Sequence, residues 1–401
     1  MKKLLLLGGS RYALPIIEAA HSMGCYVITC DYLPENVAHR YSDEYCNVSI
    51  VDERAVLEAA KNLAIDGIMS FACDPRVVTA AYVAEQLNLP TCGPYESVRI
   101  LQNKKMFREF LKKQGFCVPF AKGYKRVEEA LKEWDLFRWP VIVKPVDSAG
   151  SKGVTKVDDP GMLEKCIQYA LRFSKSNEFI IEDFLESKHH PSDSECFSVN
   201  GELKFVSYSA QRFDVSCENP YAPAAFSWQP TISVQHRKEL TDELQRLLHL
   251  LDMGTSLYNV ETRECIDGKA YIMECSPRGG GNRLSEMIRY GFGVDLISNA
   301  VRFALGEPLE DLEQKEIDGY WAEMILHSDK SGKYGYIYVA DEIRHNIIEQ
   351  DIWVEKGEQI NAFSGADKAI GTLVLKFGTE MEMNRVLDNQ KSYVKVIVDN
   401  N

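Results

Sequence analysis

Residues 1–93 alternate between short apolar runs and amphipathic segments, and this alternation restricts the fold more than any other feature of the sequence. The runs KLLLLGG, CYVITCDY and DGIMSFAC are predicted to be strands, and RYALPIIEAAHSMG, DERAVLEAAKNLA and PRVVTAAYVAEQLN are predicted to be helices. Strands separated by helices form parallel sheets with right-handed crossovers. Residues 1–98 are therefore predicted to form a Rossmann-like α/β domain.

The character of the sequence changes after residue 98. Residues 99–310 combine a lysine-rich helix (ESVRILQNKKMFREFLKKQG), short buried strands and a long amphipathic helix, whereas residues 311–401 are rich in strands such as GYWAEMILHS and AIGTLVLKFG. A chain of 401 residues is too long for one ordinary core. We therefore expect three domains of mixed α/β and α+β class, with boundaries at residues 98 and 310.

Composition excludes several classes of protein. The net charge of −13 argues against a nucleic-acid surface and against anionic membranes. The sequence contains no apolar run of about 18 residues that could span a membrane, and the four leucines after Lys3 are too few for a signal sequence. Eleven cysteines without a C-x-x-C pair fit a reducing cytoplasm.

A predicted hairpin carries the first chemical signal. The segments YNVETRECI and KAYIMECSP flank Asp267-Gly268, a pattern typical of a two-residue turn. Such a turn places Glu261 opposite Glu274 and Asn259 opposite Ser276. All four side chains then share one face, because strand residues two apart point the same way.

Two carboxylates that face each other across a ladder repel and destabilise it. Glu261 and Glu274 are explained if a hard cation such as Mg²⁺ lies between them, since Mg²⁺ prefers oxygen ligands and often shares them with substrate phosphates. The alternative is a solvated face on which Arg263 neutralises one of the acids.

Upstream residues offer further candidates for phosphate binding. Lys144 lies in the apolar strand PVIVKP and needs an anionic partner if it is buried; it could also reach solvent at the strand end. Lys104 lies on the lysine-rich helix, where a plain surface role is the alternative. The small-residue loop 147–153 has free backbone N–H groups, as lids over phosphates do. Glu182 and Asp183 end a further apolar strand. The connector after this strand has free backbone groups that could bind an adenine edge, and an ordinary turn at the strand end explains the two acids equally well.

Taken in order, these motifs resemble the ATP-grasp superfamily over roughly residues 1–310. NKKMFREFLKKQG and VIVKP resemble its two lysine segments, SAGSKGV its flexible lid, EDFL its adenine hinge, and NVETR with MECSPRGGG its two metal-carboxylate strands. The resemblance implies a central ATP-grasp domain at residues 99–310, with a lid subdomain at about 117–186. Ser276 departs from the Asn usual in the family.

The resemblance also implies a reaction. ATP and Mg²⁺ (or Mn²⁺) would activate a small carboxylate as an acyl phosphate, and an amine would then displace phosphate, giving ADP and a carbon–nitrogen bond. A homodimer is a possible assembly of the chain. A carboxylase-type enzyme that activates bicarbonate and a catalytically silent ATP-binding protein are the alternatives.

Roles follow residue by residue from the same resemblance. The residues expected to bind ATP are Lys104, Lys144, Glu182, Asp183, Phe184 and Leu185. The segment SKHHPSDSE after the hinge is longer than is usual in the family, so the ribose could be held by His190, Asp193 or Glu195. The residues expected to hold the metal are Glu261, Glu274 and Ser276. The residues expected to act in catalysis are Arg278, Lys152 and Ser151. Gly279, Gly280 and Asn282 are expected to contact the substrates. Independently of the resemblance, Arg212 and Asp214 are candidates for the acceptor site, because their opposite charges could bind the two ends of an amino acid.

Overall fold

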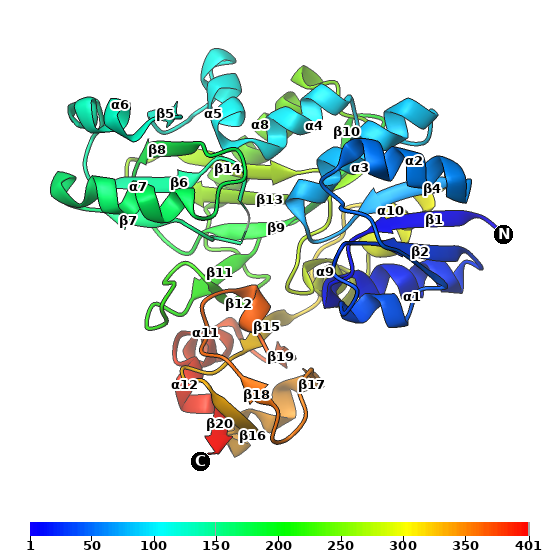
Figure 1. Ribbon diagram of the computed structural model, residues 1–401. Coiled ribbons are helices and arrows are strands. Elements are labelled where there is room, and N and C mark those ends of the chain that lie inside the picture. The colour runs from blue at the N-terminus through cyan, green and yellow to red at the C-terminus, as the bar shows by residue number, and fades with distance from the viewer. Residues whose placement is uncertain (149, 400–401) are drawn as a thin grey trace.

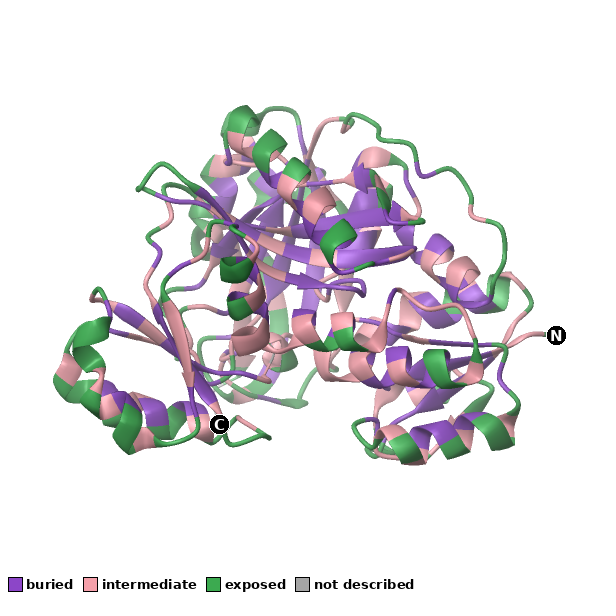
Figure 2. Cartoon of the chain, turned by 90° about the horizontal axis from the view of Figure 1, so that it is seen from above, coloured by how far each residue is buried: buried purple, intermediate pink, exposed green. Residues whose placement is uncertain are grey.

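The computed structural model describes residues 1–148 and 150–399 (Figure 1). A parallel sheet with flanking helices lies at the N-terminus, antiparallel sheets form the centre, and further sheets form the C-terminal part. This mixed α/β and α+β architecture confirms the predicted fold class. Buried residues concentrate in the sheets, while the outer helices expose one side (Figure 2). No helix in the described ranges is long and apolar enough to cross a lipid bilayer.

The N-terminal sheet is parallel throughout and has the strand order β3-β2-β1-β4. Its elements are β1 (Lys3–Leu7), α1 (Leu14–Ser22), β2 (Tyr26–Cys30), β3 (Glu44–Cys46), α2 (Glu53–Leu63), β4 (Gly67–Ser70) and α3 (Asp74–Leu87). Leu4 and Leu6 pack in one apolar cluster and Leu5 and Leu7 in another, because alternate side chains of a strand point to opposite faces. Both faces of β1 are therefore covered, as expected for a parallel sheet.

The lysine-rich segment was predicted to be one helix, and this prediction is wrong. It forms α4 (Tyr95–Gln102) and α5 (Lys104–Lys113), which are separated by Asn103. Asn103 is extended, and its side chain accepts a hydrogen bond from the Met106 backbone N–H. Asn favours this N-cap position because its oxygen satisfies a free backbone N–H of the helix. The break makes Lys104 the first residue of α5.

The segment predicted to be the lid subdomain contains an antiparallel sheet, the lid sheet, with the order β5-β8-β6-β7. Its elements are β5 (Ala121–Tyr124), α6 (Val127–Lys132), β6 (Val141–Pro145), β7 (Thr155–Val157), α7 (Leu163–Leu171) and β8 (Phe179–Asp183). Val141, Val143, Phe179 and Ile181 pack with the apolar face of α7. This packing fixes the strand ends that carry Lys144 and Glu182.

The central sheet is also antiparallel and has the order β10-β9-β13-β14. Its strands are β9 (Ser192–Val199), β10 (Glu202–Val206), β13 (Ser256–Glu264) and β14 (Ala270–Ser276), and its helices are α8 (Val234–Leu250), α9 (Leu284–Phe292) and α10 (Leu296–Ala304). Leucines of α8 pack against Tyr258, Val260 and Ile272 on one face. On the other face, Phe197, Phe205 and Leu257 pack with α9 and α10, and polar side chains of β9, β13 and β14 occupy the rest of that face.

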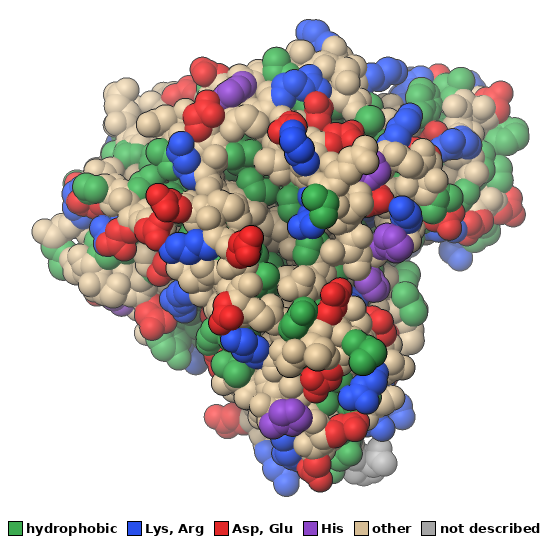
Figure 3. All heavy atoms as spheres, turned by 180° about the vertical axis from the view of Figure 1, so that it is seen from behind, with side chains coloured by type: hydrophobic (Ala, Val, Ile, Leu, Met, Phe, Trp, Pro, Cys, Tyr) green, Lys and Arg blue, Asp and Glu red, His purple; other side chains and the backbone are tan. Residues whose placement is uncertain are grey.

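The C-terminal part holds a sheet of order β11-β12-β15-β19-β17 and a smaller one of order β18-β16-β20. Its elements are β11 (Ala210–Phe213), β12 (Pro223–Ser227), β15 (Tyr320–Leu326), β16 (Gly332–Val339), β17 (Ile347–Ile352), β18 (Gln359–Ile360), β19 (Gly371–Phe377), α11 (Glu380–Asp388), α12 (Gln390–Tyr393) and β20 (Val394–Asp399). On the face of the molecule drawn in Figure 3, acidic and basic side chains are interspersed.

Residues 202–213 contain two strands, β10 and β11, that belong to different sheets. The segment between β10 and β11 continues along β9 through serine hydroxyls: Ser207 Oγ donates to the Glu195 carbonyl (2.9 Å) and Ser209 Oγ to the Asp193 carbonyl (2.7 Å). β12, which pairs with β11, then pairs with β15. The C-terminal sheet is thus attached directly beside β9.

Glu323 is an unusual feature of that sheet. It lies on β15, is fully buried, and neither carboxylate oxygen has a hydrogen-bond partner among the described residues. Burial raises the pKa of this carboxyl well above its usual value, and the nearby charge of Arg283 offsets this only in part. Glu323 is therefore protonated in the folded protein at pH values where the unfolded chain has released the proton.

The free energy of unfolding should consequently fall as pH rises above the pKa of an unfolded Glu, about 4.3, by about 1.4 kcal/mol per pH unit from this group. Glu323→Gln should remove that slope, so the variant gains stability relative to the native chain between pH 5 and pH 7. Urea unfolding at a series of pH values measures the difference. The exposed Glu342→Gln is the matched control, and parallel pH profiles of the Glu323→Gln and native proteins would contradict the prediction.

Candidate active site

The pairing of the β13–β14 hairpin confirms the predicted register at the polar end. Glu261 lies opposite Glu274, and Asn259 lies opposite Ser276. Tyr258 and Val260, the neighbours of Asn259 along β13, face α8. Since neighbouring residues of a strand point to opposite faces, the two carboxylates lie on the face of the sheet that α8 leaves open.

The turn of this hairpin differs from the prediction. The Cys265 N–H donates to the Lys269 carbonyl (2.9 Å), so the loop contains residues 266–268 instead of two residues. The ladder then shifts by one residue between Glu261 and Thr262, where Met273 is the extra residue on β14. This β-bulge restores the register that a two-residue turn would have produced.

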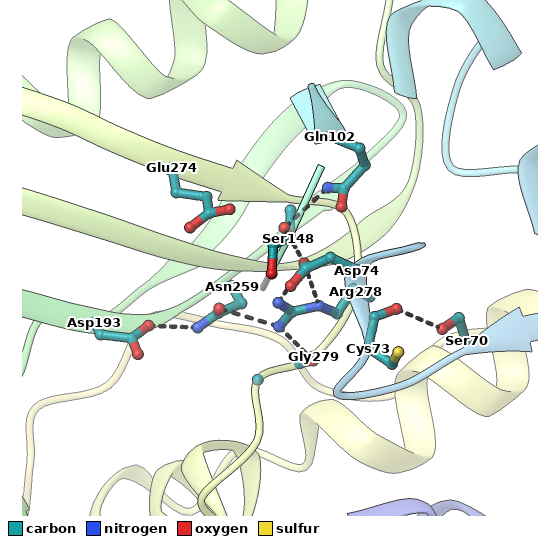
Figure 4. A network of polar contacts seen from close by, with 12 residues as sticks. Ser70, Cys73, Asp74, Gln102, Ser148, Asp193, Asn259, Glu274, Arg278 and Gly279 are labelled. Carbon is teal, nitrogen blue, oxygen red and sulfur yellow. Dashed lines mark hydrogen bonds and ion pairs between the residues drawn. The ribbon is translucent and has the colours of Figure 1, made fainter. Parts of the chain in front are cut away.

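A third carboxylate lies beside the pair. Asp193 on β9 is opposite Glu261, so Asp193, Glu261 and Glu274 follow one another across three strands. Asp193 accepts a hydrogen bond from the Asn259 side-chain amide at 2.6 Å (Figure 4). Burial, together with the charge of Glu261, raises the pKa of Asp193 to about 7. The row has a surplus of negative charge.

Two cations partly balance the row. Lys104 Nζ lies 3.2 Å from Glu274 Oε1, and Arg263 Nη2 lies 2.8 Å from Glu261 Oε1. Lys104 also donates to the Ser148 carbonyl at 3.0 Å, which joins α5 to the loop after β6. The first-turn position created by the Asn103 cap thus brings Lys104 to the carboxylates.

Arg278 lies at the end of the row next to an acid from the N-terminal domain. Its Nε donates to Asp74 Oδ1 at 2.9 Å, and its Nη1 donates to Asn259 Oδ1 at 3.0 Å (Figure 4). The Ser276 hydroxyl donates to the same Asp74 oxygen at 2.6 Å and accepts from Gln102 Nε2 at 2.9 Å. Ser276 is fully buried, and its hydroxyl is already hydrogen-bonded to Asp74 and Gln102.

Close packing requires the first two glycines after Arg278. A Cβ on Gly279 would lie 2.1 Å from Cε2 of Phe71, and a Cβ on Gly280 would lie 2.6 Å from Cδ1 of Leu284. The Gly280 N–H donates to the buried Glu195 carboxylate at 2.6 Å. The loop is therefore clamped between the N-terminal domain and β9.

Beyond the glycines the chain contacts both terminal domains. Asn282 Oδ1 accepts a hydrogen bond from the Tyr12 hydroxyl at 3.1 Å. Arg283 forms ion pairs with Glu286 and with Glu349 of β17, each at 2.8 Å. Asn282 therefore lies where the N-terminal domain meets the glycine loop, and Arg283 joins this loop to the C-terminal sheet.

Lys144 is buried, as the apolar strand predicted, and its partner is Glu182. Lys144 Nζ lies 2.7 Å from Glu182 Oε2, and Arg108 Nε lies 2.8 Å from Glu182 Oε1. Although burial disfavours the charged form, the charges of Arg108 and Lys144 lower the pKa of Glu182 to about 2. Two cations and one carboxylate leave this cluster with a net positive charge.

The segment after Glu182 packs against the lid sheet. The Asp183 side chain accepts from the Arg138 N–H (2.9 Å), and the Phe184 N–H donates to the Pro140 carbonyl (3.0 Å). Lys156 lies over the Phe184 ring at 4.8 Å. The N–H of Leu185 has no hydrogen-bond partner within the described residues.

The predicted lid loop follows β6 and contacts the segment between β11 and β12. Ser151 adopts a left-handed conformation (φ 57°), and its hydroxyl donates to the Tyr221 carbonyl at 3.3 Å. Lys152 is exposed. Ala149, which belongs to the same predicted loop, lies outside the described residues.

Three predicted residues lie apart from the carboxylate row and have C-terminal partners. Arg212 bonds Asp388 (2.8 Å) and Asn384 (2.7 Å) of α11, His190 lies 3.8 Å from Asp388, and Asp214 pairs with His327 (3.1 Å). Strand alternation directs the neighbouring Gln211 the other way, and its amide reaches Asp193 at 3.4 Å. The structure thus does not bring Arg212 and Asp214 to the carboxylates.

The sequence reading missed Asp74, Gln102 and Arg108. They lie at the start of α3, at the end of α4 and within α5, and each contacts β14 or the residues after it. Asp74 had one detectable signal, because an acid before Pro75 directly after a predicted strand is typical of a helix start at a sheet's carboxyl edge. Gln102 and Arg108 look like ordinary helix residues in the sequence.

Comparison with known proteins places these features in a family. Residues 101–281 match the family model described as "ATP-grasp domain". The chain contains an ATP-grasp domain. The match begins just before Lys104 and ends with the third glycine after Arg278, so it spans all of the residues that form the carboxylate row and its cations. The resemblance stated from the sequence is confirmed.

Individual relatives of the chain are distant but cover most of it. It is 25% identical over 341 residues to a formate-dependent phosphoribosylglycinamide formyltransferase of Synechococcus sp. (strain WH7803), covering 82% of both chains. Its structure resembles an L-amino acid ligase from Bacillus licheniformis with a TM-score of 0.81 and 20% identity, over 100% of this chain and 99% of that one. It also resembles a phosphoribosylglycinamide synthetase from Anaerococcus prevotii with a TM-score of 0.76 and 19% identity, over 99% and 100%.

Proposed function

We propose that this protein is an ATP-dependent ligase that activates a small carboxylate as an acyl phosphate and transfers the acyl group to an amine. The observation that carries the proposal is the row of carboxylates at Glu261 and Glu274, with Lys104 on one side and Arg278 on the other. Phosphoryl transfer depends on positioning and on neutralising charge, and these residues supply both.

The donor set fits a hard divalent cation. Glu261 and Glu274 offer carboxylate oxygens on one face, and Asp193 and the Asn259 amide oxygen lie beside them; Mg²⁺ and Mn²⁺ bind such oxygen ligands. A bound cation would neutralise phosphate charge and orient the γ-phosphate. We assign the metal to the two glutamates, with Ser276 in a supporting role through its bond to Asp74.

Lys104 and Lys144 are the proposed anchors of the ATP phosphates. Both are largely buried and already face carboxylates, so an incoming phosphate would share their charge. The N–H of Leu185, which has no partner among residues 1–148 and 150–399, is suited to an adenine ring nitrogen, and Glu182 to Leu185 would form the adenine site. Asp193 and His190 remain candidates for the ribose. Ser151 and Lys152 would close over the phosphates and exclude water, which otherwise hydrolyses an acyl phosphate.

The chemistry has two steps. A carboxylate oxygen of the substrate attacks the γ-phosphorus, the bond to the bridging oxygen breaks, and ADP leaves. The amine nitrogen then attacks the acyl carbon, loses a proton, and inorganic phosphate leaves. Arg278 would bind the carboxylate or the transferred phosphoryl group, because its planar fork suits either. Gly279, Gly280 and Asn282 would border this position, and Arg212 and Asp214 stay more remote candidates for the amine.

Lys144→Ala should weaken ADP binding by about 1.5–3 kcal/mol, the range for a hydrogen bond to a charged group. Lys144 also neutralises the buried Glu182, so we also use Lys144→Met, which keeps most of the side-chain volume without the charge and should show a similar loss. Calorimetric titration with ADP measures both variants. The exposed Lys165→Ala on α7 is the control, and unchanged ADP affinity for both Lys144 variants would remove Lys144 from the ATP site.

Trapping of the acyl phosphate tests the proposed function. The purified protein is incubated with ATP, Mg²⁺, hydroxylamine and one carboxylate at a time, because hydroxylamine converts an acyl phosphate into a stable hydroxamate. We expect a hydroxamate, together with ADP release, for at least one carboxylate, and amide formation when an amine replaces hydroxylamine. ADP release that depends only on bicarbonate would instead indicate a carboxylase-type enzyme, and tight ATP binding without turnover would indicate a silent binding protein.

The proposal also includes the cellular location, the substrates and the oligomeric state of the enzyme. It acts on small molecules in the cytoplasm, which fits its free cysteines and its acidic charge. A homodimer remains a prediction, which the molar mass in solution tests.

A further inference from the structure

Arg108 is a buried cation for which neither the sequence nor the proposed reaction provides a role. It lies one helical turn after Lys104 on α5, so both side chains point to the same side of the helix. Only 3% of Arg108 is exposed. A buried guanidinium is costly unless it is paired and hydrogen-bonded, and its partners are therefore informative.

One partner is the β-bulge beside Glu274. Arg108 Nη1 donates to the carbonyl oxygen of Met273 at 2.8 Å, and Met273 is the extra residue of β14. β14 is the edge strand of the central sheet, so in the described residues no further strand pairs with its outer side, and the Met273 carbonyl can accept from Arg108. Arg108 thus binds the distorted part of the strand directly.

The bulge decides where Glu274 points. Without the extra residue, the register of Thr262 with Ile272 would continue, and Met273 would face Glu261 in place of Glu274. A one-residue slip moves every following side chain to the other face of the strand. Glu274 would then point toward α8 and away from Glu261. Stabilising the bulge therefore amounts to stabilising the metal site.

The second partner is Glu182, which also binds Lys144. Arg108 Nε lies 2.8 Å from one oxygen of Glu182, and Lys144 Nζ lies 2.7 Å from the other. If Arg108 were absent, Glu182 would neutralise Lys144 alone. With Arg108 present, the three groups carry one net positive charge, so positive charge remains available at Lys144 for a phosphate.

We propose that Arg108 is a positioning residue that couples the two halves of the site: it fixes the bulge that presents Glu274 to the metal and pairs with Glu182 so that Lys144 can hold a phosphate. This inference rests on the proposed function, because it assigns Glu274 to the metal and Lys144 to ATP. It adds Arg108, which would contact neither the metal nor ATP and would act through Glu274 and Lys144.

ADP binding measured with and without Mg²⁺ tests the proposal without catalysis. Calorimetric titrations give the factor by which Mg²⁺ raises the affinity of the native protein for ADP. In Arg108→Met this factor should fall by about tenfold or more, the equivalent of about 1.4 kcal/mol, and ADP affinity without Mg²⁺ should fall by a few-fold as well. Arg108→Lys should fall between the two, since one ammonium cannot reproduce the two contacts of the planar fork.

The controls separate positioning from general destabilisation. Arg99→Met removes an exposed arginine of α4 and should change neither titration. If Arg108→Met lowers the melting temperature but keeps the full effect of Mg²⁺ on ADP affinity, Arg108 is only structural and the proposal is wrong. If Arg108→Met does not fold, the same comparison in Arg108→Lys decides. A native protein that binds Mg²⁺ and ADP but yields no hydroxamate would refute the proposed ligase activity and leave this test intact.

Discussion

Glu274→Gln is expected to reduce the rate of acyl-phosphate formation by about a thousandfold or more, the upper range for losing one preorganised electrostatic contact to the transition state. The amide keeps the shape of the side chain but removes the negative charge that faces Glu261 and binds Lys104. Hydroxamate formation under saturating ATP and Mg²⁺ is the measurement. Glu261→Gln should give a loss of similar size.

The structure also changes the expected effect of this substitution on stability. Repulsion between the two carboxylates alone would make Glu274→Gln more stable than the native protein. Each carboxylate, however, already has its own cation, Lys104 for Glu274 and Arg263 for Glu261. We therefore expect Glu274→Gln to lose up to about 1 kcal/mol, as for a partly exposed ion pair.

The matched control is Glu239→Gln on the exposed face of α8, which should keep both the rate and the stability. Native-like hydroxamate formation by Glu274→Gln would refute its assignment to the metal. Urea unfolding in the absence of Mg²⁺ checks the stability, and a clear gain there would show that repulsion dominates over the contact with Lys104.

Arg278→Lys is expected to lower the ligation rate by about a hundredfold or more and to leave ADP affinity within about threefold of the native value. The guanidinium donates to Asp74, to Asn259 and to the Gly279 carbonyl at the same time. A single ammonium on a shorter side chain cannot occupy these positions and also present a planar fork to the reacting group.

Because an interaction made mainly in the transition state affects kcat and kcat/KM together, both constants should fall in parallel in Arg278→Lys. Arg289→Lys, on the exposed side of α9, serves as the control. If Arg278→Lys loses ADP binding but keeps its rate at saturating ATP, Arg278 is a nucleotide ligand and the position proposed for the substrate carboxylate is wrong.

Several features were determined by the sequence alone because they depend on local patterns. The strand-helix alternation of residues 1–93 defined a parallel sheet, since each element must bury its apolar face against the next. The two-residue period of strands placed Asn259 and Glu261 on one face. The apolar strand around Lys144 predicted a buried lysine in need of an anionic partner, and that partner is Glu182.

Other features were decided only by the tertiary structure, because they depend on residues far apart in the chain. The turn prediction gave the right pairing of Glu261 with Glu274, but in the structure this pairing depends on a three-residue loop and on the Met273 bulge together. Asp74 contacts Ser276 across 202 residues of sequence, and Arg108 reaches Met273 across 165. Local periodicity records which face of an element is buried; it does not record which distant group supplies the partner, because only packing brings the two segments together.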